Sequence, residues 1–92
     1  MEAVLEVKVK GDINVILTDN VWNKISRNHP EAARYFDKFE NTLKKPDKIL
    51  TGYGGATKAA LNLGKNKWLV IIWKEVGKNK GRIKTVYITK RL

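Results

Sequence analysis

The amino-acid sequence contains no cysteine and a single histidine among its 92 residues. Without cysteine the chain has neither a disulfide framework nor thiolate ligands for a metal, and one imidazole supplies too few nitrogen ligands for a zinc centre. We therefore expect no metal site and no cofactor. Any chemistry that this chain performs must use ordinary acidic, basic and hydroxyl side chains.

Long hydrophobic runs are also missing. The longest includes Leu69 to Trp73, whereas a membrane-spanning helix needs about 20 apolar residues. The Met1 end lacks the basic segment followed by an apolar one that is typical of a signal peptide. These absences predict a cytoplasmic protein with no membrane partner. The length and the hydrophobic content of 42% predict a single domain over residues 1–92 with one core.

Acidic residues are scarce in the second half of the chain, which explains the formal net charge of +10. Up to Asp47, eight Lys and Arg balance eight Asp and Glu; from Lys48 onward, eleven Lys and Arg accompany one acid, Glu75. A concentrated basic surface attracts phosphates, whereas dispersed charge only aids solubility. The asymmetry therefore predicts that the C-terminal half binds a polyanion, with nucleic acid favoured.

A lysine-rich composition can also arise from adaptation to high temperature. Thermophilic proteins that carry extra lysine for stability usually raise glutamate with it, and the acids of this chain do not follow its lysines. Charge alone also leaves an anionic membrane surface or an acidic protein open as the partner.

The first half of the chain predicts two strands followed by two helices. Ala3 to Lys10 alternates with the period of a half-buried strand, and Asn14 to Leu17 is a second β-type run. Thr18 or Asp19 then offers a side-chain oxygen to cap a short helix. A second helix is predicted from about Pro30 to Lys44, with one apolar stripe formed by Ala32, Tyr35, Phe36, Phe39 and Leu43.

Four β segments follow, separated by short glycine-containing connections: Lys48–Tyr53, Thr57–Leu63, Lys67–Val76 and Arg82–Arg91. Such connections predict antiparallel hairpins. The expected fold is α+β, with two N-terminal helices packed on a mainly four-stranded antiparallel sheet and one or two extra N-terminal strands. Leu69 to Trp73 is apolar on both faces and predicts a central strand. The helices should cover one side of the sheet and leave the other to a ligand.

His29 stands out because histidine is the side chain that changes charge near neutral pH. It lies between the two predicted helices, just before Pro30, which favours an exposed junction and proton transfer. Glu31, two residues later, is placed to affect the imidazole electrostatically. The competing interpretation is that His29 is an ordinary helix-end residue that caps or packs.

The last predicted strand places Thr85, Tyr87 and Thr89 on one face and aliphatic residues on the other. A hydroxyl and a phenol beside lysines suit phosphate binding and base stacking, although threonine and tyrosine are also common strand formers. Trp68 and Trp73 lie on opposite faces by parity, and the sequence does not indicate which faces a ligand. Several aromatic residues alternate with cations in a way that suits base stacking: Trp22, Tyr53, Trp68, Trp73 and Tyr87.

The glycine-rich segment Tyr53-Gly54-Gly55 has some likeness to a phosphate-binding loop. A P-loop places Lys followed by Ser or Thr at a fixed spacing after its glycines, and this chain does not. The segment is therefore predicted to be a turn.

Two stretches together resemble a known family. They are Ile16–Ile49, with Trp22, Ile25, His29-Pro30-Glu31, Thr42-Leu43 and Pro46-Asp47-Lys48-Ile49, and Trp68–Tyr87, with Trp68-Leu69-Val70-Ile71-Ile72 and Ile83-Lys84-Thr85-Val86-Tyr87. In order and spacing these motifs resemble the phage-associated branch of the barnase, EndoU, colicin and RelE-like ribonuclease superfamily. The resemblance extends from about Asn14 to Arg91.

The resemblance implies metal-independent endoribonuclease activity of a toxin-like or phage-effector-like kind. In that chemistry the ribose 2′-hydroxyl attacks the adjacent phosphate. His29 matches the family's helix-junction histidine, Thr85 and Tyr87 match its hydroxyl-bearing last strand, and Lys58 takes the position of a cation that stabilises the transition state. The chain has lysine at position 58, whereas arginine would contact a phosphate with two parallel hydrogen bonds.

The partners implied are RNA and an antitoxin or immunity protein. The residues expected to bind nucleic acid are Lys74, Lys78, Lys80, Arg82 and Lys84. Two alternatives remain: a non-catalytic nucleic-acid-binding domain that uses the same basic sheet, and a structural interaction domain whose affinity would lack a steep dependence on salt.

Overall fold

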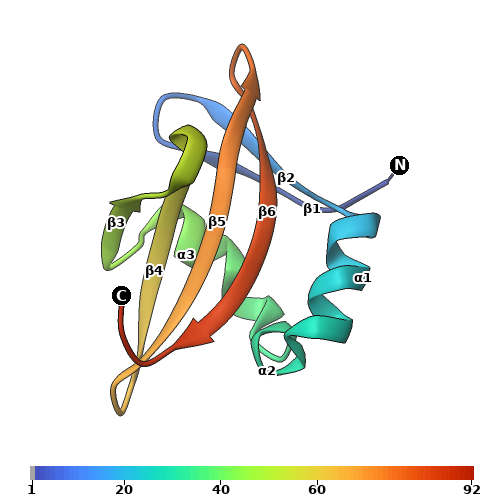
Figure 1. Cartoon of the computed structure of the whole chain (residues 1–92). Helices are drawn as coiled ribbons and strands as arrows, with labels where there is room; N and C mark the ends of the chain where they lie inside the picture. The colour runs from blue at the N-terminus through green and yellow to red at the C-terminus, as the bar shows by residue number, and fades with distance from the viewer. Residues whose placement is uncertain (1) are drawn as a thin grey trace.

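The computed structural model describes residues 2–92, which form one sheet and three short helices (Figure 1). In chain order the elements are β1 (Ala3–Val9), β2 (Ile13–Thr18), α1 (Asp19–Asn28), α2 (Pro30–Ala33), the 3-10 turn η1 (Phe36–Lys38), α3 (Phe39–Lys44), β3 (Lys48–Thr51), the 3-10 turn η2 (Tyr53–Gly55), β4 (Thr57–Gly64), β5 (Lys67–Gly77) and β6 (Lys80–Thr89). The class is α+β, as the sequence predicts.

The prediction of two helices on a mainly four-stranded antiparallel sheet is wrong. The sheet has six strands in the order β1-β2-β6-β5-β4-β3, and it is mixed because β2 pairs with β6 in parallel through residues 14–16 and 80–82. The β1–β2 hairpin extends the sheet beyond the four later strands. The alternating pattern of β1 and β2 predicts a hairpin, but it does not specify which strand of the sheet the hairpin pairs with. The sequence therefore does not predict the parallel contact between β2 and β6.

The second helix is also different from the one predicted. Residues 30–44 form α2, then η1, then α3. The chain tightens at Tyr35, whose N–H donates to Ala32 O at 3.0 Å and whose carbonyl accepts from Lys38 N at 2.8 Å. This bend brings the Phe36 ring within 4.9 Å of Trp22 and 5.4 Å of Phe39, measured between centroids. Aromatic packing against α1 therefore overrides the regular helical period in this segment.

Helix α1 begins as the sequence predicts. The Thr18 side chain accepts a hydrogen bond from Val21 N at 3.4 Å and caps the helix. Its one fully buried residue, Ile25, joins a single hydrophobic cluster with the inward-facing residues of the sheet, including Leu17, Leu69 and Ile71. The central position predicted for Leu69–Trp73 is confirmed, because β5 lies between β4 and β6.

A bulge in β6 sets which side chains face the helices. Ile72 pairs with Thr85 and Trp73 pairs with Ile83, which leaves Lys84 between them without a partner in the register. The extra residue changes the alternation of the strand. As a result Ile83 and Val86, three residues apart, are both buried in the core.

Position 81 requires glycine because the Trp73 side chain packs directly on the backbone of β6 there. A Cβ atom at position 81 would lie 2.9 Å from Trp73 Cε3 and 3.3 Å from Val15 Cγ2. Because this is a buried overpacking contact, Gly81→Ala is expected to lower the free energy of unfolding by about 1–3 kcal/mol. Gly77→Ala is the matched control, since its Cβ would meet only Lys80 at 3.9 Å. Urea denaturation of both variants measures the difference, and equal stabilities would contradict the packing described for Trp73.

Candidate active site on the open face of the sheet

The helices pack against one face of the sheet, and we call the opposite face of β3–β6 the open face (Figure 1). It is defined by cross-strand rows, because residues paired across a sheet point to the same side. One row joins Lys58, Ile72 and Thr85, and the next joins Ala60, Val70 and Tyr87. Three of the four predicted catalytic residues therefore share this face.

Lys58 and Thr85 stand at the two ends of the first row, with Ile72 between them. Adjacent strands are about 4.8 Å apart, so their backbones are separated by about 10 Å. Among residues 2–92, Lys58 is also the one lysine that is half-buried rather than exposed.

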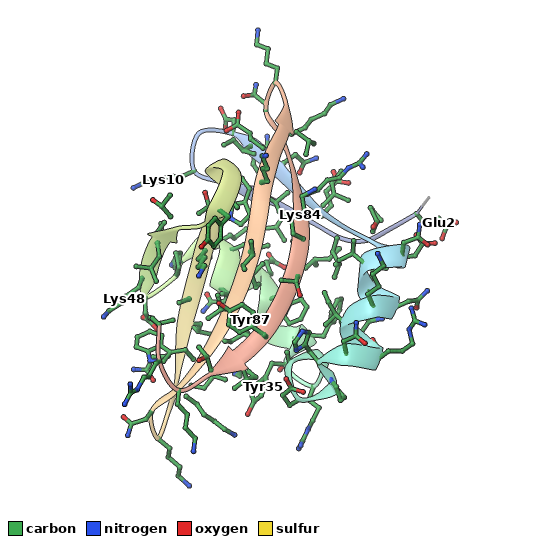
Figure 2. The ribbon with its side chains drawn as sticks, viewed as in Figure 1. Glu2, Lys10, Tyr35, Lys48, Lys84 and Tyr87 are labelled. Carbon is green, nitrogen blue, oxygen red and sulfur yellow. The ribbon has the colours of Figure 1, made fainter. Side chains whose placement is uncertain are left out.

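Tyr87 lies in the adjacent row and brings the sheet close to the helix junction. Figure 2 labels it on the lower part of β6. Its row partner Val70 is fully buried, as is Ala60 next to it, so this part of the open face is covered. Helices α1 and α2 both contact β6, and the His29 ring centroid lies 6.4 Å from that of Tyr87.

His29 is held firmly by the backbone although its ring is accessible. Its N–H donates to Ile25 O at 2.7 Å, and its carbonyl accepts from Ala32 N at 2.9 Å and Ala33 N at 3.0 Å. The junction residue thus ends α1 and begins α2. The side chain is 38% exposed, and its Nδ1 lies 3.5 Å from a Glu31 carboxylate oxygen. Nε2 is the ring nitrogen that does not take part in this contact.

The five predicted nucleic-acid-binding cations form two groups. Lys74, Lys80 and Arg82 lie in the paired parts of β5 and β6, whereas Lys78 and Lys84 lie in the turn and at the bulge. Lys74 and Arg82 are direct cross-strand partners, and Lys80 lies two residues before Arg82 on β6. Lys78 is in the β5–β6 turn, and Lys84 is the bulge residue, labelled on β6 in Figure 2. All five side chains are exposed. Residues 48–92, which the structure describes in full, contain one acid, Glu75, and it pairs with Gly81 on the core side.

The two tryptophans of β5 lie on different sides of the sheet. Trp73 is 9% exposed and belongs to the core, whereas Trp68 pairs with Asn62 and Thr89 on the open face. The ammonium group of Lys48 lies 5.5 Å from the centroid of a Trp68 ring, which is cation–π geometry. The Lys48–Trp68 pair adds a cation and an aromatic ring to the open face on the β3 side of Tyr87.

Tyr53 is one of the aromatic residues that the sequence suggests for base stacking, although it is not among the predicted catalytic or nucleic-acid-binding residues. The turn predicted for Tyr53-Gly54-Gly55 is confirmed, and it forms η2 between β3 and β4. Tyr53 is 100% exposed, and it lines a hollow of about 240 Å³ together with Thr51, Gly52 and Lys58. The signal available in the sequence is an aromatic residue followed by two glycines, a context that offers no apolar neighbours to bury the ring.

A larger hollow of about 350 Å³ lies on the other side of the sheet, beside the end of α3. Its walls include Leu43, Ile49 and Trp73, and it contains none of the candidate site residues. Among residues 2–92, no three His, Cys, Asp or Glu side chains gather as metal ligands would. Within the same described part of the chain, no helix has the length and apolar character needed to cross a membrane.

No family model matches the chain, and neither a curated protein nor a solved structure matches it.

Proposed function

We propose that the protein is a metal-independent endoribonuclease that binds RNA on the open face and cleaves it between β4, β6 and the α1–α2 junction. The observation that carries the proposal is that four half-buried residues from three separate parts of the chain lie on the open face or at its helix edge. Lys58 and Thr85 share a row, Tyr87 lies in the next row, and His29 faces Tyr87 from the helix junction.

Cleavage proceeds by attack of the ribose 2′-oxygen on the adjacent phosphorus. The O2′–P bond forms and the P–O5′ bond breaks, which gives a 2′,3′-cyclic phosphate and a 5′-hydroxyl end. One group must accept the 2′-hydroxyl proton and another must donate a proton to O5′. His29, oriented by Glu31, moves protons in this scheme, and Tyr87 serves as the acid or stacks on a base.

Lys58 and Thr85 act on the phosphate itself. The ammonium group of Lys58 offsets the negative charge that develops on the phosphorane, and Arg82 is the second cation available for that role. The Thr85 hydroxyl orients the phosphate. The exposed cations around Lys74 bind the flanking phosphates and set the register of the RNA on the sheet.

A second function, a non-catalytic nucleic-acid-binding domain, is favoured by a different observation. Lys74 and Arg82 are paired and exposed at one end of the open face, and the fully exposed Tyr53 lies nearby. Binding requires only these groups, whereas turnover also requires His29.

The cellular setting follows from the ribonuclease proposal. Acting on RNA places the protein in the cytoplasm, in a toxin-like or phage-effector-like role. Such an activity calls for a partner that restrains it, an antitoxin or immunity protein, and covering the open face is the direct way to do so.

The proposal is tested by incubating the protein with end-labelled RNA and with DNA of the same sequence in excess EDTA. We expect cleavage of the RNA only. Salt-sensitive binding of the RNA without cleavage would instead favour the non-catalytic domain, and salt-insensitive binding would favour neither.

A further inference from the structure

The β3–β4 loop presents an aromatic ring that does not contribute to the core. Tyr53 is the one aromatic residue among those described that is 100% exposed. A tyrosine usually buries much of its ring, because the ring is largely apolar. Packing within this chain therefore does not explain the residue.

The loop that holds Tyr53 has a defined conformation. Ala56 N donates to Tyr53 O at 3.1 Å, and Gly52 N donates to Ala56 O at 2.8 Å. Gly54 and Gly55 have φ values of 63° and 81°, which glycine adopts without strain. The ring thus stands on an ordered turn.

Two cations from the open face lie beside this turn. A Cβ atom built at Gly54 would be 3.6 Å from Lys74 Nζ, so the Lys74 ammonium group lies against the loop. Lys58 lines the same hollow as Tyr53. Aromatic rings next to cations that track a phosphate backbone are the arrangement by which proteins bind single-stranded nucleic acid.

We infer that Tyr53 stacks on an unpaired nucleobase of the RNA, while Lys74 and Lys58 contact the phosphates on either side of that nucleotide. This inference rests on the proposed function, because it takes the open face as the RNA surface. It specifies the substrate class as single-stranded RNA, since bases in a duplex already stack on each other and do not present a free face to the ring. Because Lys58 also contacts the scissile phosphate, the stacked base belongs to a nucleotide next to the cleavage site.

The test compares Tyr53→Ala, Tyr53→Phe and the control Ile49→Ala, which removes another exposed apolar side chain, 65% exposed, from the opposite side of β3. Affinity is measured by anisotropy with a single-stranded RNA, and stacking is measured by the fluorescence of 2-aminopurine placed in that RNA. We expect Tyr53→Ala to weaken binding about 5- to 100-fold and to restore the quenched 2-aminopurine signal, whereas Tyr53→Phe keeps both near wild type.

Unchanged affinity and unchanged 2-aminopurine fluorescence in Tyr53→Ala would overturn the inference. A wild-type protein that still cleaves RNA would then leave the proposed function standing. Equal weakening by Tyr53→Phe would also overturn stacking, because phenylalanine preserves the ring. If wild-type protein binds no RNA, both the proposed function and this inference fail. If it does bind RNA, the Tyr53 variants test this inference separately from the proposed function.

Discussion

Replacing His29 with alanine is expected to lower RNA cleavage about 100- to 10,000-fold, the usual contribution of a positioned acid or base. RNA affinity should change little, because the phosphate-binding cations lie on β4, β5 and β6 rather than at the helix junction. The junction itself should persist, since its hydrogen bonds use backbone atoms of His29. Single-turnover cleavage and equilibrium binding, measured on the same RNA, separate the two effects.

The control for this variant is Asn28→Ala, which alters the exposed neighbouring residue at the end of α1. It should cleave RNA as wild type does. Glu31→Gln tests orientation separately: it keeps the shape of the side chain, removes the charge near Nδ1, and should cause a smaller loss of rate than His29→Ala. Cleavage by His29→Ala at the rate of the Asn28 control would remove His29 from the reaction.

Reversing the charges of the Lys74 and Arg82 pair is expected to weaken RNA binding about 10- to 100-fold and to reduce the slope of log affinity against log salt by about 1.4, the value for two phosphate contacts with a single strand. The two side chains are cross-strand partners and both are exposed, so Lys74→Glu with Arg82→Glu places two carboxylates where phosphates should lie. Cleavage at saturating RNA should fall less than affinity.

The matched control is Lys24→Glu with Lys38→Glu, which changes the net charge equally but at exposed positions of α1 and η1. It should retain most of the affinity and the full salt slope. Equal losses in the two double variants would mean that binding follows net charge alone and has no preferred face, which contradicts the interface described for β5 and β6.

Local patterns in the sequence predict local structure well. The Thr18 cap, the interior position of β5 and the single polar face of Thr85, Tyr87 and Thr89 all occur in the structure, because each depends on residues adjacent in the chain. The parallel contact between β2 and β6 joins residues 14–16 to residues 80–82. The hydrophobic periodicity of one segment carries no information about its pairing with a distant segment. The six-stranded mixed sheet therefore cannot be predicted from local patterns.

The break between α2 and α3 has a related cause. The apolar stripe from Ala32 to Leu43 fits one continuous helix, yet the aromatic cluster with Trp22 bends the chain at Tyr35. Propensity therefore gives way to tertiary packing. The bulge at Lys84 is hidden for the same reason, since only the register with β5 shows that this residue has no partner.

The sequence proposes members of a candidate site but not their arrangement. A family resemblance and strand parity indicate His29, Lys58, Thr85 and Tyr87, and the structure brings them to one region of the open face and its helix edge. The sequence suggests Tyr53 for base stacking, but it does not show which cations lie beside the turn that carries this residue. The contact of Lys74 with the η2 loop depends on how β5 and the β3–β4 connection meet.

The chemical ends of the cleavage products decide whether the ribose 2′-hydroxyl is the nucleophile. Wild-type protein is incubated in excess EDTA with an RNA and with the same RNA carrying one 2′-deoxynucleotide at the mapped cleavage site. We expect 2′,3′-cyclic phosphate and 5′-hydroxyl ends from the first RNA and no cleavage at the substituted position in the second. Products with 5′-phosphate ends, or cutting at the deoxynucleotide, would show that the 2′-hydroxyl does not attack and would contradict the proposed mechanism.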